Sequence, residues 1–239
     1  MKNIIAVAIL IFFSLVSFAG VGEPKFDPSS WDKLLQKNVS NQGNVNYEGF
    51  KKDHVAFDTY LASISTTKPD GNWSRNETMA YWINAYNAFT IKLMLTNYPL
   101  KSIMEINGGK AWDLKFIDIK GEKYSLNNIE HDILRKKYAD PRIHFAVNCA
   151  SVSCPKLSNT AFFADGLDEK LDKAAKEFIN NSSKNAITAT KAEISKLFDW
   201  YKDDFTKNGT VVDYLNRYLT TKLTTTKISF KEYNWSINK

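Results

Sequence analysis

The sequence lacks the features that would indicate a membrane protein, a nucleic-acid-binding protein or a chain of several domains. Beyond Ala19, no apolar stretch approaches the roughly 20 residues that a helix needs to span a bilayer. The formal net charge is +6, but lysines are scattered among acidic residues and form no basic block, which argues against nucleic acid as a partner. No internal repeat occurs, and no linker is long enough to separate two domains. We therefore expect one globular domain with a core of ordinary size.

Residues 1–19 are the exception, because they have the pattern of a signal peptide. A short positive start precedes an almost wholly apolar run from Ile4 to Phe18. Small residues flank Phe18 in the pattern that signal peptidase accepts, which predicts cleavage before Gly20. No cysteine follows that would carry a lipid anchor. The expected product is an exported protein, periplasmic or secreted, with no stable membrane anchor after cleavage.

Hydrophobic spacing in the remaining chain predicts a helix-rich α+β fold with a small, mostly antiparallel sheet. Residues 20–44 are expected to form a lead-in with a short helix, and residues 45–239 the globular domain. Helices are predicted at 31–37, 53–64, 76–97, 126–137, 167–180, 192–205 and 211–219, a hairpin at 114–124, a central strand at 142–148 and a last strand at 227–233.

The longest helical candidate, residues 76–97, has apolar residues on every side, which indicates that it is buried on every side. Asn84 and Asn87 lie one turn apart on one face of it. A buried amide without a partner costs about 1–3 kcal/mol. Both side chains are therefore expected to have hydrogen-bond partners.

The only two cysteines, Cys149 and Cys154, lie in one short segment that follows the predicted central strand. Three interpretations stay open. In an oxidising compartment the two thiols would form a disulfide that contributes roughly 2 kcal/mol through chain entropy. Together with His144 they would offer metal ligands, but no fourth ligand is visible, so no metal or other cofactor is expected. In the third interpretation Cys149 is a nucleophile.

A nucleophilic cysteine needs a histidine that takes its proton and a third group that orients that histidine. Glu130 directly precedes His131, but adjacent residues on a helix point about 100 degrees apart, so Glu130 is expected to orient a different group. His144 has the opposite strand parity to Cys149 and reaches it only if the chain turns by Asn148. The choice between the two histidines as base stays open.

Several of these segments resemble the bacterial form of the DUF547 family, a family without an assigned activity. The resemblance covers most of the chain from Val45 onward. Some relatives, notably in plants, keep the residue matching Cys149 but have serine where Cys154 stands, which implies a separate role for Cys149. The segments that carry the resemblance are YWINAYNA at 81–88, SLNNIEHDILR at 125–135, PRIHFAVNCASVSCP at 141–155, LDEKL at 167–171, FDWY at 198–201 with DF at 204–205, and YNWSIN at 233–238.

The buried helix at 76–97, followed by a β-rich stretch that holds a histidine, is also loosely similar to papain- and transglutaminase-like cysteine enzymes. In those enzymes the helix would begin with the nucleophilic cysteine, whereas this sequence has only Asn84 or Asn87 there. The similarity is an analogy of fold.

The leading functional hypothesis is a pocket at the end of segment 142–148 that catalyses acyl transfer or amide hydrolysis. An enzyme of this kind requires Cys149 within a few ångströms of an imidazole, at the floor of a cleft that solvent reaches. In this hypothesis Cys149 is the nucleophile, His131 or His144 is the base, and Glu130 is a further catalytic group. Asn84 or Asn87 would be an orienting group or an oxyanion donor. The substrate would be bound by Arg135 or Arg142, which anchors a carboxylate, and by Tyr86 and Trp82.

The alternative is a catalytically inert scaffold, in which a surface binds peptide, glycan or another envelope protein. Its thiol and imidazole groups would be far apart or sealed from solvent. The buried polar network that specifies such a fold would consist of Asn84, Asn87, Glu130, His131 and Arg142.

Overall fold

Helix α4 (Arg75–Thr96) lies at the centre of the larger of two hydrophobic clusters in the computed structural model, which describes residues 25–225 and 227–239. The signal peptide expected at residues 1–19 lies outside the described residues. Every residue of α4 from Met79 to Ile91 is buried, as the all-round apolar pattern predicts. Ser74 begins the helix, because its hydroxyl accepts from the backbone N–H of Glu77 while the Glu77 carboxylate accepts from the N–H of Ser74.

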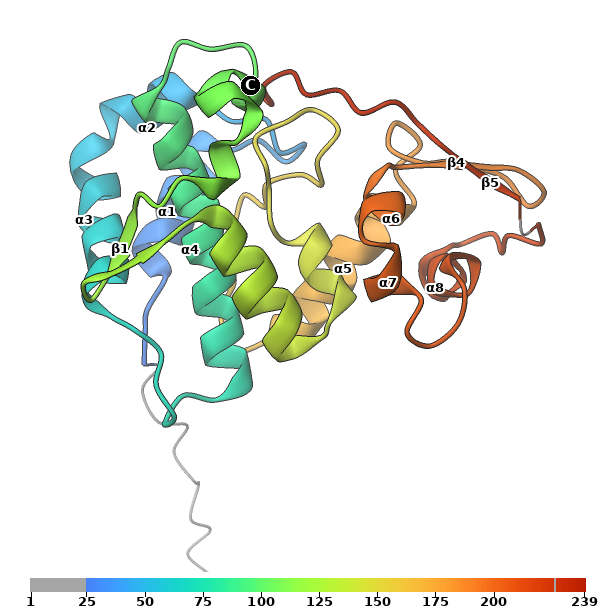
Figure 1. Cartoon of the computed structure of the whole chain (residues 1–239), viewed down its shortest axis with the longest axis horizontal. Helices are drawn as coiled ribbons and strands as arrows, with labels where there is room; N and C mark the ends of the chain where they lie inside the picture. The colour runs from blue at the N-terminus through green and yellow to red at the C-terminus, as the bar shows by residue number, and fades with distance from the viewer. Residues whose placement is uncertain (1–24, 226) are drawn as a thin grey trace, which may run out of the picture.

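Three shorter helices, α1 (Ser29–Asn38), α2 (Tyr47–Lys52) and α3 (His54–Thr66), pack beside α4 (Figure 1). Trp31 of α1 stacks on Tyr60 of α3, with ring centroids 5.4 Å apart. The predicted lead-in helix is thus part of the same hydrophobic cluster as α4.

A tight hairpin packs against α3, and an irregular helix packs against α4. Strands β1 (Ile117–Ile119) and β2 (Glu122–Tyr124) pair antiparallel, and Gly121 between them has a φ of 81°, in the left-handed region that glycine adopts readily. They follow two 3₁₀ segments, η1 (Ile103–Gly109) and η2 (Ala111–Asp113). The π-helix η3 (Asn128–Tyr138) comes next and packs on α4.

The predicted central strand at 142–148 is wrong. This segment begins with a 3₁₀ helix, η4 (Pro141–Phe145), in which the Asp140 carboxylate caps the N–H of Arg142 and proline occupies the first position. The alternation that indicated a strand arises because consecutive residues enter different environments. Ile143 joins the larger cluster, Phe145 joins the second, and His144 between them is buried in polar contacts.

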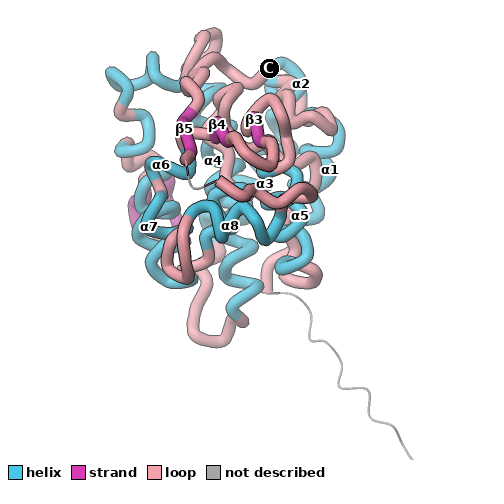
Figure 2. The backbone as a smooth tube through the Cα atoms, turned by 90° about the vertical axis from the view of Figure 1, so that its right-hand side faces the viewer, coloured by secondary structure: helices cyan, strands magenta, loops and turns pink. Residues whose placement is uncertain are grey.

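The second hydrophobic cluster lies at the opposite end of the molecule (Figure 1) and contains Phe145, Phe178 and Phe198. Its three strands lie side by side (Figure 2), with β3–β4 antiparallel and β4–β5 parallel. The elements that contribute to this end are α5 (Leu167–Ile179), β3 (Ala186–Ile187), β4 (Ala192–Ile194), α6 (Leu197–Trp200), α7 (Lys202–Phe205), α8 (Val211–Tyr218) and β5 (Ile228–Phe230).

The single helix predicted at 192–205 is wrong in its first part. Residues 192–194 pair with both β3 and β5, and Asn185 accepts from the backbone N–H of Ser195 just after the strand. Two short helices, α6 and α7, follow. The fold class is nevertheless as predicted, because the chain is helix-rich with two small sheets in which two of the three strand pairings are antiparallel.

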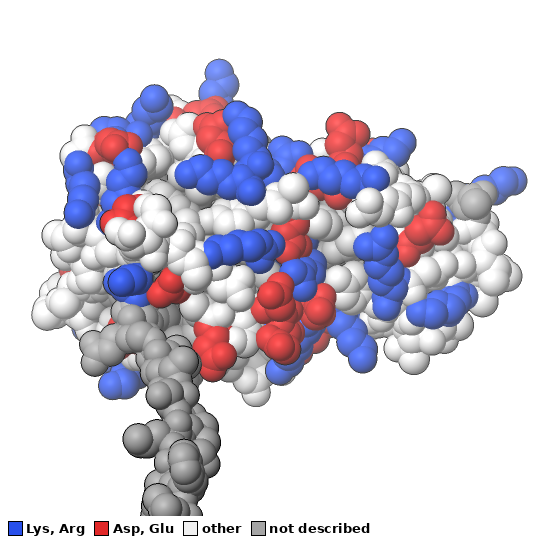
Figure 3. Space-filling model, turned by 90° about the horizontal axis from the view of Figure 1, so that it is seen from below, with Lys and Arg blue, Asp and Glu red and all other residues white. Residues whose placement is uncertain are grey.

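The surface carries charges of both signs. On the face that Figure 3 shows, Lys and Arg side chains are interspersed with Asp and Glu. Among residues 25–225 and 227–239, none of the helices is sufficiently long and apolar to cross a bilayer.

Replacing Ser74 with alanine removes the side-chain half of the α4 cap. We expect Ser74→Ala to lower the free energy of unfolding by about 1 kcal/mol, measured by urea denaturation. Ser182→Ala, at an exposed position, is the control and should stay within about 0.5 kcal/mol of the parent protein. Equal losses in the two variants would contradict the capping role.

Candidate functional site

A cavity of about 180 Å³ lies where the two hydrophobic clusters meet. We call it the thiol cavity, because both cysteines line it. Six of its 14 lining residues are Tyr or Trp. Its lining residues are Tyr86, Trp112, Asn127, Glu130, His144, Val147, Cys149, Cys154, Pro155, Leu197, Trp200, Tyr201, Tyr233 and Trp235.

The loop that carries the cysteines is held by three buried side chains, Asn87, Asn148 and Asn238, which we call the asparagine cluster. Asn87 accepts from the N–H of Asn148 and donates to the carbonyl of Ala146, both at 2.9 Å. Asn148 donates to the carbonyl of Pro155 at 2.7 Å and accepts from Asn238 at 3.1 Å. The asparagine cluster therefore fixes the backbone at both ends of the cysteine loop.

The C-terminal segment holds the outer side of the same loop. The N–H of Val152 donates to the carbonyl of Ser236 at 2.8 Å, and the N–H of Ser153 donates to that of Asn234 at 3.1 Å. These contacts bring Tyr233 over the thiols.

The sulfur of Cys149 is surrounded by hydrogen-bonding groups. Cys154 Sγ lies 2.9 Å from it, Ser151 Oγ 3.2 Å and the Tyr233 hydroxyl 3.3 Å. Hydrogen bonds to the thiolate, that from Cys154 being the most important, lower the pKa of Cys149 to about 7, although burial and the nearby Glu130 carboxylate oppose this. Cys149 is thus a thiolate in a large fraction of molecules at neutral pH.

Cys154 has the opposite character. It is buried, whereas Cys149 is partly exposed, and both are free thiols. Burial, together with the hydrogen bond and charge of Cys149, raises the pKa of Cys154 well above its ordinary value. The sulfurs are closer than two non-bonded sulfur atoms usually lie, and a disulfide bond would need them at about 2.05 Å. Only a small side-chain movement separates this pair from a disulfide.

His144 is oriented by a carboxylate. Its Nε2–H donates to Asp204 at 2.7 Å, and its ring stacks on Tyr201 with centroids 3.9 Å apart. Burial lowers the pKa of His144, which outweighs the opposing effects of Asp204 and Glu130, so the imidazole is neutral at neutral pH. Its Nδ1 therefore has a free lone pair. In the described part of the chain Nδ1 has no hydrogen-bond partner and lies 4.0 Å from Glu130 Oε1.

Asp204 joins His144 to Arg135. The Arg135 guanidinium donates to the same carboxylate oxygen at 2.6 Å. Burial would raise the pKa of Asp204, but the hydrogen bonds from His144 and Arg135 outweigh it and hold that pKa below its ordinary value. Arg135 also contacts His131 Nδ1 at 3.0 Å. The guanidinium of Arg135, predicted to anchor a substrate carboxylate, is thus paired with Asp204 of the protein itself.

No histidine side chain of the described residues forms a hydrogen bond with Cys149 Sγ. Across residues 25–225 and 227–239, the side-chain hydrogen bonds of Cys149 Sγ reach Ser151, Cys154 and Tyr233, and no histidine. His131 is not among the residues that line the thiol cavity, whereas His144 is. Of the two predicted bases, only His144 shares the cavity with Cys149.

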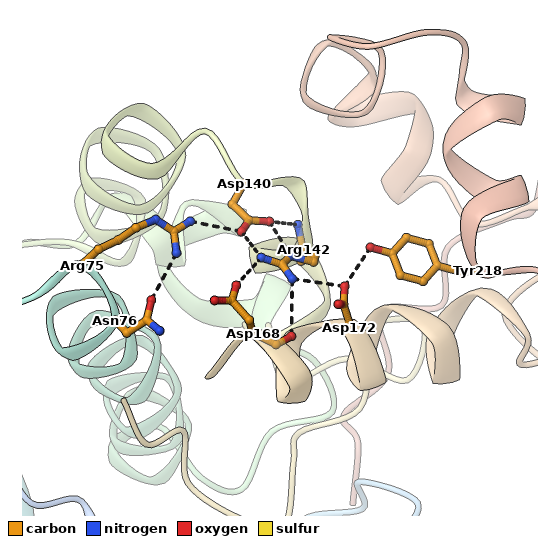
Figure 4. Close-up of polar contacts among 7 residues, drawn as sticks. All are labelled: Arg75, Asn76, Asp140, Arg142, Asp168, Asp172 and Tyr218. Atoms are coloured by element: carbon orange, nitrogen blue, oxygen red, sulfur yellow. Dashed lines mark hydrogen bonds and ion pairs between the residues drawn. The ribbon is translucent and has the colours of Figure 1, made fainter. Parts of the chain in front are cut away.

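Arg142 lies in an ion-pair network away from the thiol cavity (Figure 4). Its guanidinium contacts Asp140 and Asp168 at 2.6 Å and Asp172 at 3.1 Å. The network ties η4 to α5, and Arg142, predicted to anchor a substrate carboxylate, does not line the thiol cavity.

Of the other predicted residues, Tyr86 lines the thiol cavity, whereas Asn84 and Trp82 do not. Asn84 donates to the carbonyl of Phe162 at 2.6 Å and accepts from its N–H at 3.0 Å, so its amide holds backbone and does not reach the cavity. Asn87, the other predicted oxyanion donor, also holds backbone and does not line the cavity. Trp82 packs on Tyr124 and lines a different hollow.

Sequence reasoning missed Ser151, two residues from Cys149, and the residues that reach the site from distant segments. Ser151, Tyr233 and Asp204 make direct contacts with Cys149 or His144, and Trp200 with Trp235 forms part of the wall. The motifs FDWY, DF and YNWSIN contain four of these five residues, but nothing in their spacing indicates that they converge. Three His, Cys, Asp or Glu side chains suited to a metal ion do not gather anywhere in the described residues.

Fold and site together define a helix-rich α+β domain with a pair of thiols in an aromatic cavity. The family model described as "Protein of unknown function, DUF547" matches residues 71–179, the segment from the start of α4 to the end of α5 that contains both cysteines. This match supports the DUF547 family, which is uncharacterised. No curated protein and no solved structure matches the chain significantly.

We expect alkylation of Cys149 by iodoacetamide to rise with pH and to be half-maximal near pH 7, because the thiolate is the reacting form. The rate is read by mass spectrometry of the native protein. Tyr233→Phe removes one donor to the thiolate and should move the midpoint upward. Tyr98→Phe, which removes a hydroxyl that does not line the cavity, is the matched control. A midpoint near the ordinary cysteine value of about 8.5 in the parent protein would contradict the donor arrangement.

Proposed function

We propose that the protein carries out thiol–disulfide exchange, with Cys149 as the attacking thiol and Cys154 as the second thiol. The observation that carries this proposal is the 2.9 Å separation of the two free sulfurs on a loop whose backbone is fixed at both ends. The partly exposed sulfur has the lowered pKa, and the buried sulfur has the raised one.

The chemistry fits the groups that are present. The Cys149 thiolate attacks one sulfur of a substrate disulfide, forms a mixed disulfide and releases the other half as a thiolate. Cys154 then loses its proton and attacks Cys149 Sγ, which gives the Cys149–Cys154 disulfide and releases the second half of the substrate as a thiol. The substrate gains two electrons and the protein loses two, so turnover needs a dithiol reductant. No histidine base is required, because a thiolate is already available and the leaving group is itself a thiolate.

Export would place this dithiol in a compartment where disulfides form. The signal-peptide pattern of residues 1–19 supports export. We therefore include a periplasmic or secreted location in the proposal.

A second candidate is acyl transfer or amide hydrolysis by Cys149, supported by the His144–Asp204 pair in the same cavity. Asp204 orients the imidazole and leaves the Nδ1 lone pair available, as a general base requires. Against it, Nδ1 is sealed from solvent and makes no hydrogen bond to Cys149 within the described chain. Amide cleavage would need this nitrogen to reach the leaving group. A non-catalytic scaffold is supported by the asparagine cluster, whose hydrogen bonds hold the backbone of the cysteine loop.

Cys154→Ser should trap the mixed disulfide that the parent protein resolves. We expect this variant, mixed with bis(2-hydroxyethyl) disulfide, to accumulate one adduct on Cys149, because no second thiol can displace it. The parent protein should give the intramolecular disulfide and no lasting adduct. Intact-mass spectrometry distinguishes the products, and Cys149→Ser is the control that should form neither. Stable adducts on the parent protein would contradict a resolving role for Cys154.

Acyl transfer makes a different prediction. With an activated aryl ester under reducing conditions, an acyl-enzyme on Cys149 would form and turn over, and His144→Gln would slow turnover by about 100-fold or more. Absorbance of the released phenol follows the reaction. Acylation of Cys149 that is equally fast in His144→Gln would rule out His144 as the base and would leave exchange as the chemistry of this thiol.

A further inference from the structure

We propose that the thiol cavity binds a cationic group of the substrate, with Glu130 as the charge partner and aromatic rings as the walls. This inference deepens the proposed function and rests on it for the chemistry, because it names the class of disulfide that reaches Cys149. The preferred substrate is a disulfide that carries an ammonium or guanidinium group close to its sulfur atoms.

The walls of the cavity suit a cation. Trp200, Tyr233 and Trp235 contact one another, with centroids 4.7 Å apart for Trp200–Tyr233, 4.5 Å for Tyr233–Trp235 and 5.7 Å for Trp200–Trp235. Tyr86 and Tyr201 line the cavity further in. Trp200 is 48 % exposed, which is unusual for a large aromatic residue. Aromatic faces attract ammonium and guanidinium groups through their quadrupoles, Trp most strongly.

The carboxylate in the cavity lacks a cation. Glu130 is only 5 % exposed, and its side chain accepts one hydrogen bond, from the Tyr201 hydroxyl at 2.7 Å. Within residues 25–225 and 227–239 its nearest basic group is His144 Nδ1 at 4.0 Å, and that imidazole is neutral at neutral pH. Burying a carboxylate with a single hydrogen bond and no counter-charge is costly, and a bound cation removes that cost.

The charges around the cavity do not balance. Glu130 and Asp204 are two carboxylates, and Arg135 is paired with Asp204. Lys184 donates to the carbonyl of Val152 in the cysteine loop and interacts with the charge of the thiols, but it does not line the cavity. The Cys149 thiolate adds further negative charge at neutral pH. No lysine or arginine of the described residues lines the cavity. Such a site favours cationic ligands and repels anionic ones.

The volume sets the size of the ligand. About 180 Å³ accommodates one side chain or a small amine, not a folded segment.

The first test compares three linear disulfides with Cys154→Ser, in which the mixed disulfide accumulates. Cystamine carries two positive charges, bis(2-hydroxyethyl) disulfide is neutral, and dithiodiglycolate carries two negative charges. Each rate is divided by the rate of 2-mercaptoethanol with the same reagent, which removes intrinsic differences in reactivity. We expect cystamine to exceed the neutral disulfide by about tenfold and dithiodiglycolate to be the slowest.

Glu130→Gln in the same background should bring the normalised rates of the three disulfides to within about threefold of one another. The reason is that the amide keeps an acceptor for Tyr201 but loses the charge. Glu169→Gln, at an exposed position of α5, is the matched control and should keep the full spread. A charge preference that is unchanged in Glu130→Gln, or no preference in the parent background, would overturn the inference.

The second test is independent of thiol chemistry. Cys149→Ala cannot exchange, and its binding of benzylamine and of the nearly isosteric, neutral benzyl alcohol is measured by calorimetry and by tryptophan fluorescence. We expect benzylamine to bind at least about tenfold more tightly, and the difference to vanish in Cys149→Ala with Glu130→Gln. If benzylamine is preferred while Cys149 reacts with no disulfide, the proposed function fails and the cation site stands. If exchange occurs but benzyl alcohol binds equally well, or neither compound binds, the cation site fails.

Discussion

The hydrogen bond between the Asn87 side chain and the backbone N–H of Asn148 is the constraint on which the site depends. It connects the middle of the buried helix α4 to the residue before Cys149. Asn148 extends the connection to Pro155 and Asn238, so the cysteine loop is held at both ends and against the C-terminal segment. The three asparagine side chains are buried. The hydrogen-bonded backbone therefore determines where the two sulfur atoms lie, and no covalent bond between them is needed.

A fixed loop lets short-range hydrogen bonds determine the properties of each thiol. The two cysteines are five residues apart and share one environment, yet the pKa of Cys149 is lowered and that of Cys154 is raised. The difference comes from geometry, since Cys154 and the hydroxyls of Ser151 and Tyr233 hydrogen-bond to the thiolate of Cys149, while burial raises the pKa of the deeper Cys154. His144 is held by its hydrogen bond to Asp204, which Arg135 also contacts, and burial lowers its pKa so that the imidazole stays neutral despite this carboxylate.

Local signals in the sequence predicted much of the fold and less of the site. Helix α4 was predictable because its cap, its length and its apolar periodicity all lie within its own residues. The segment after Pro141 was not, because a short alternating run of buried residues fits a strand as well as a 3₁₀ turn between two clusters. Cys149, Cys154, Glu130, His144 and Tyr86 were all singled out from sequence and do meet at one cavity. Asp204 and Tyr233 are 60 and 84 residues from the groups they contact, and no periodicity encodes such pairings.

The asparagine cluster holds the cysteine loop mainly through amide groups, and the backbone N–H of Cys149 also donates to Cys154 Sγ. This arrangement has an evolutionary consequence. The side chains of Asn87 and Asn148 each donate one hydrogen bond and accept at least one other. Replacing either residue with aspartate or leucine would leave a buried polar group without a partner. Mutations at the two positions are therefore expected to be strongly epistatic. Cys154 Sγ accepts the backbone N–H of Cys149 at 3.0 Å, and a serine hydroxyl can accept the same bond. A serine at position 154 therefore leaves the asparagine cluster intact. The proposed redox chemistry can thus be lost or regained by a single codon change along a lineage, while the fold around residue 149 persists.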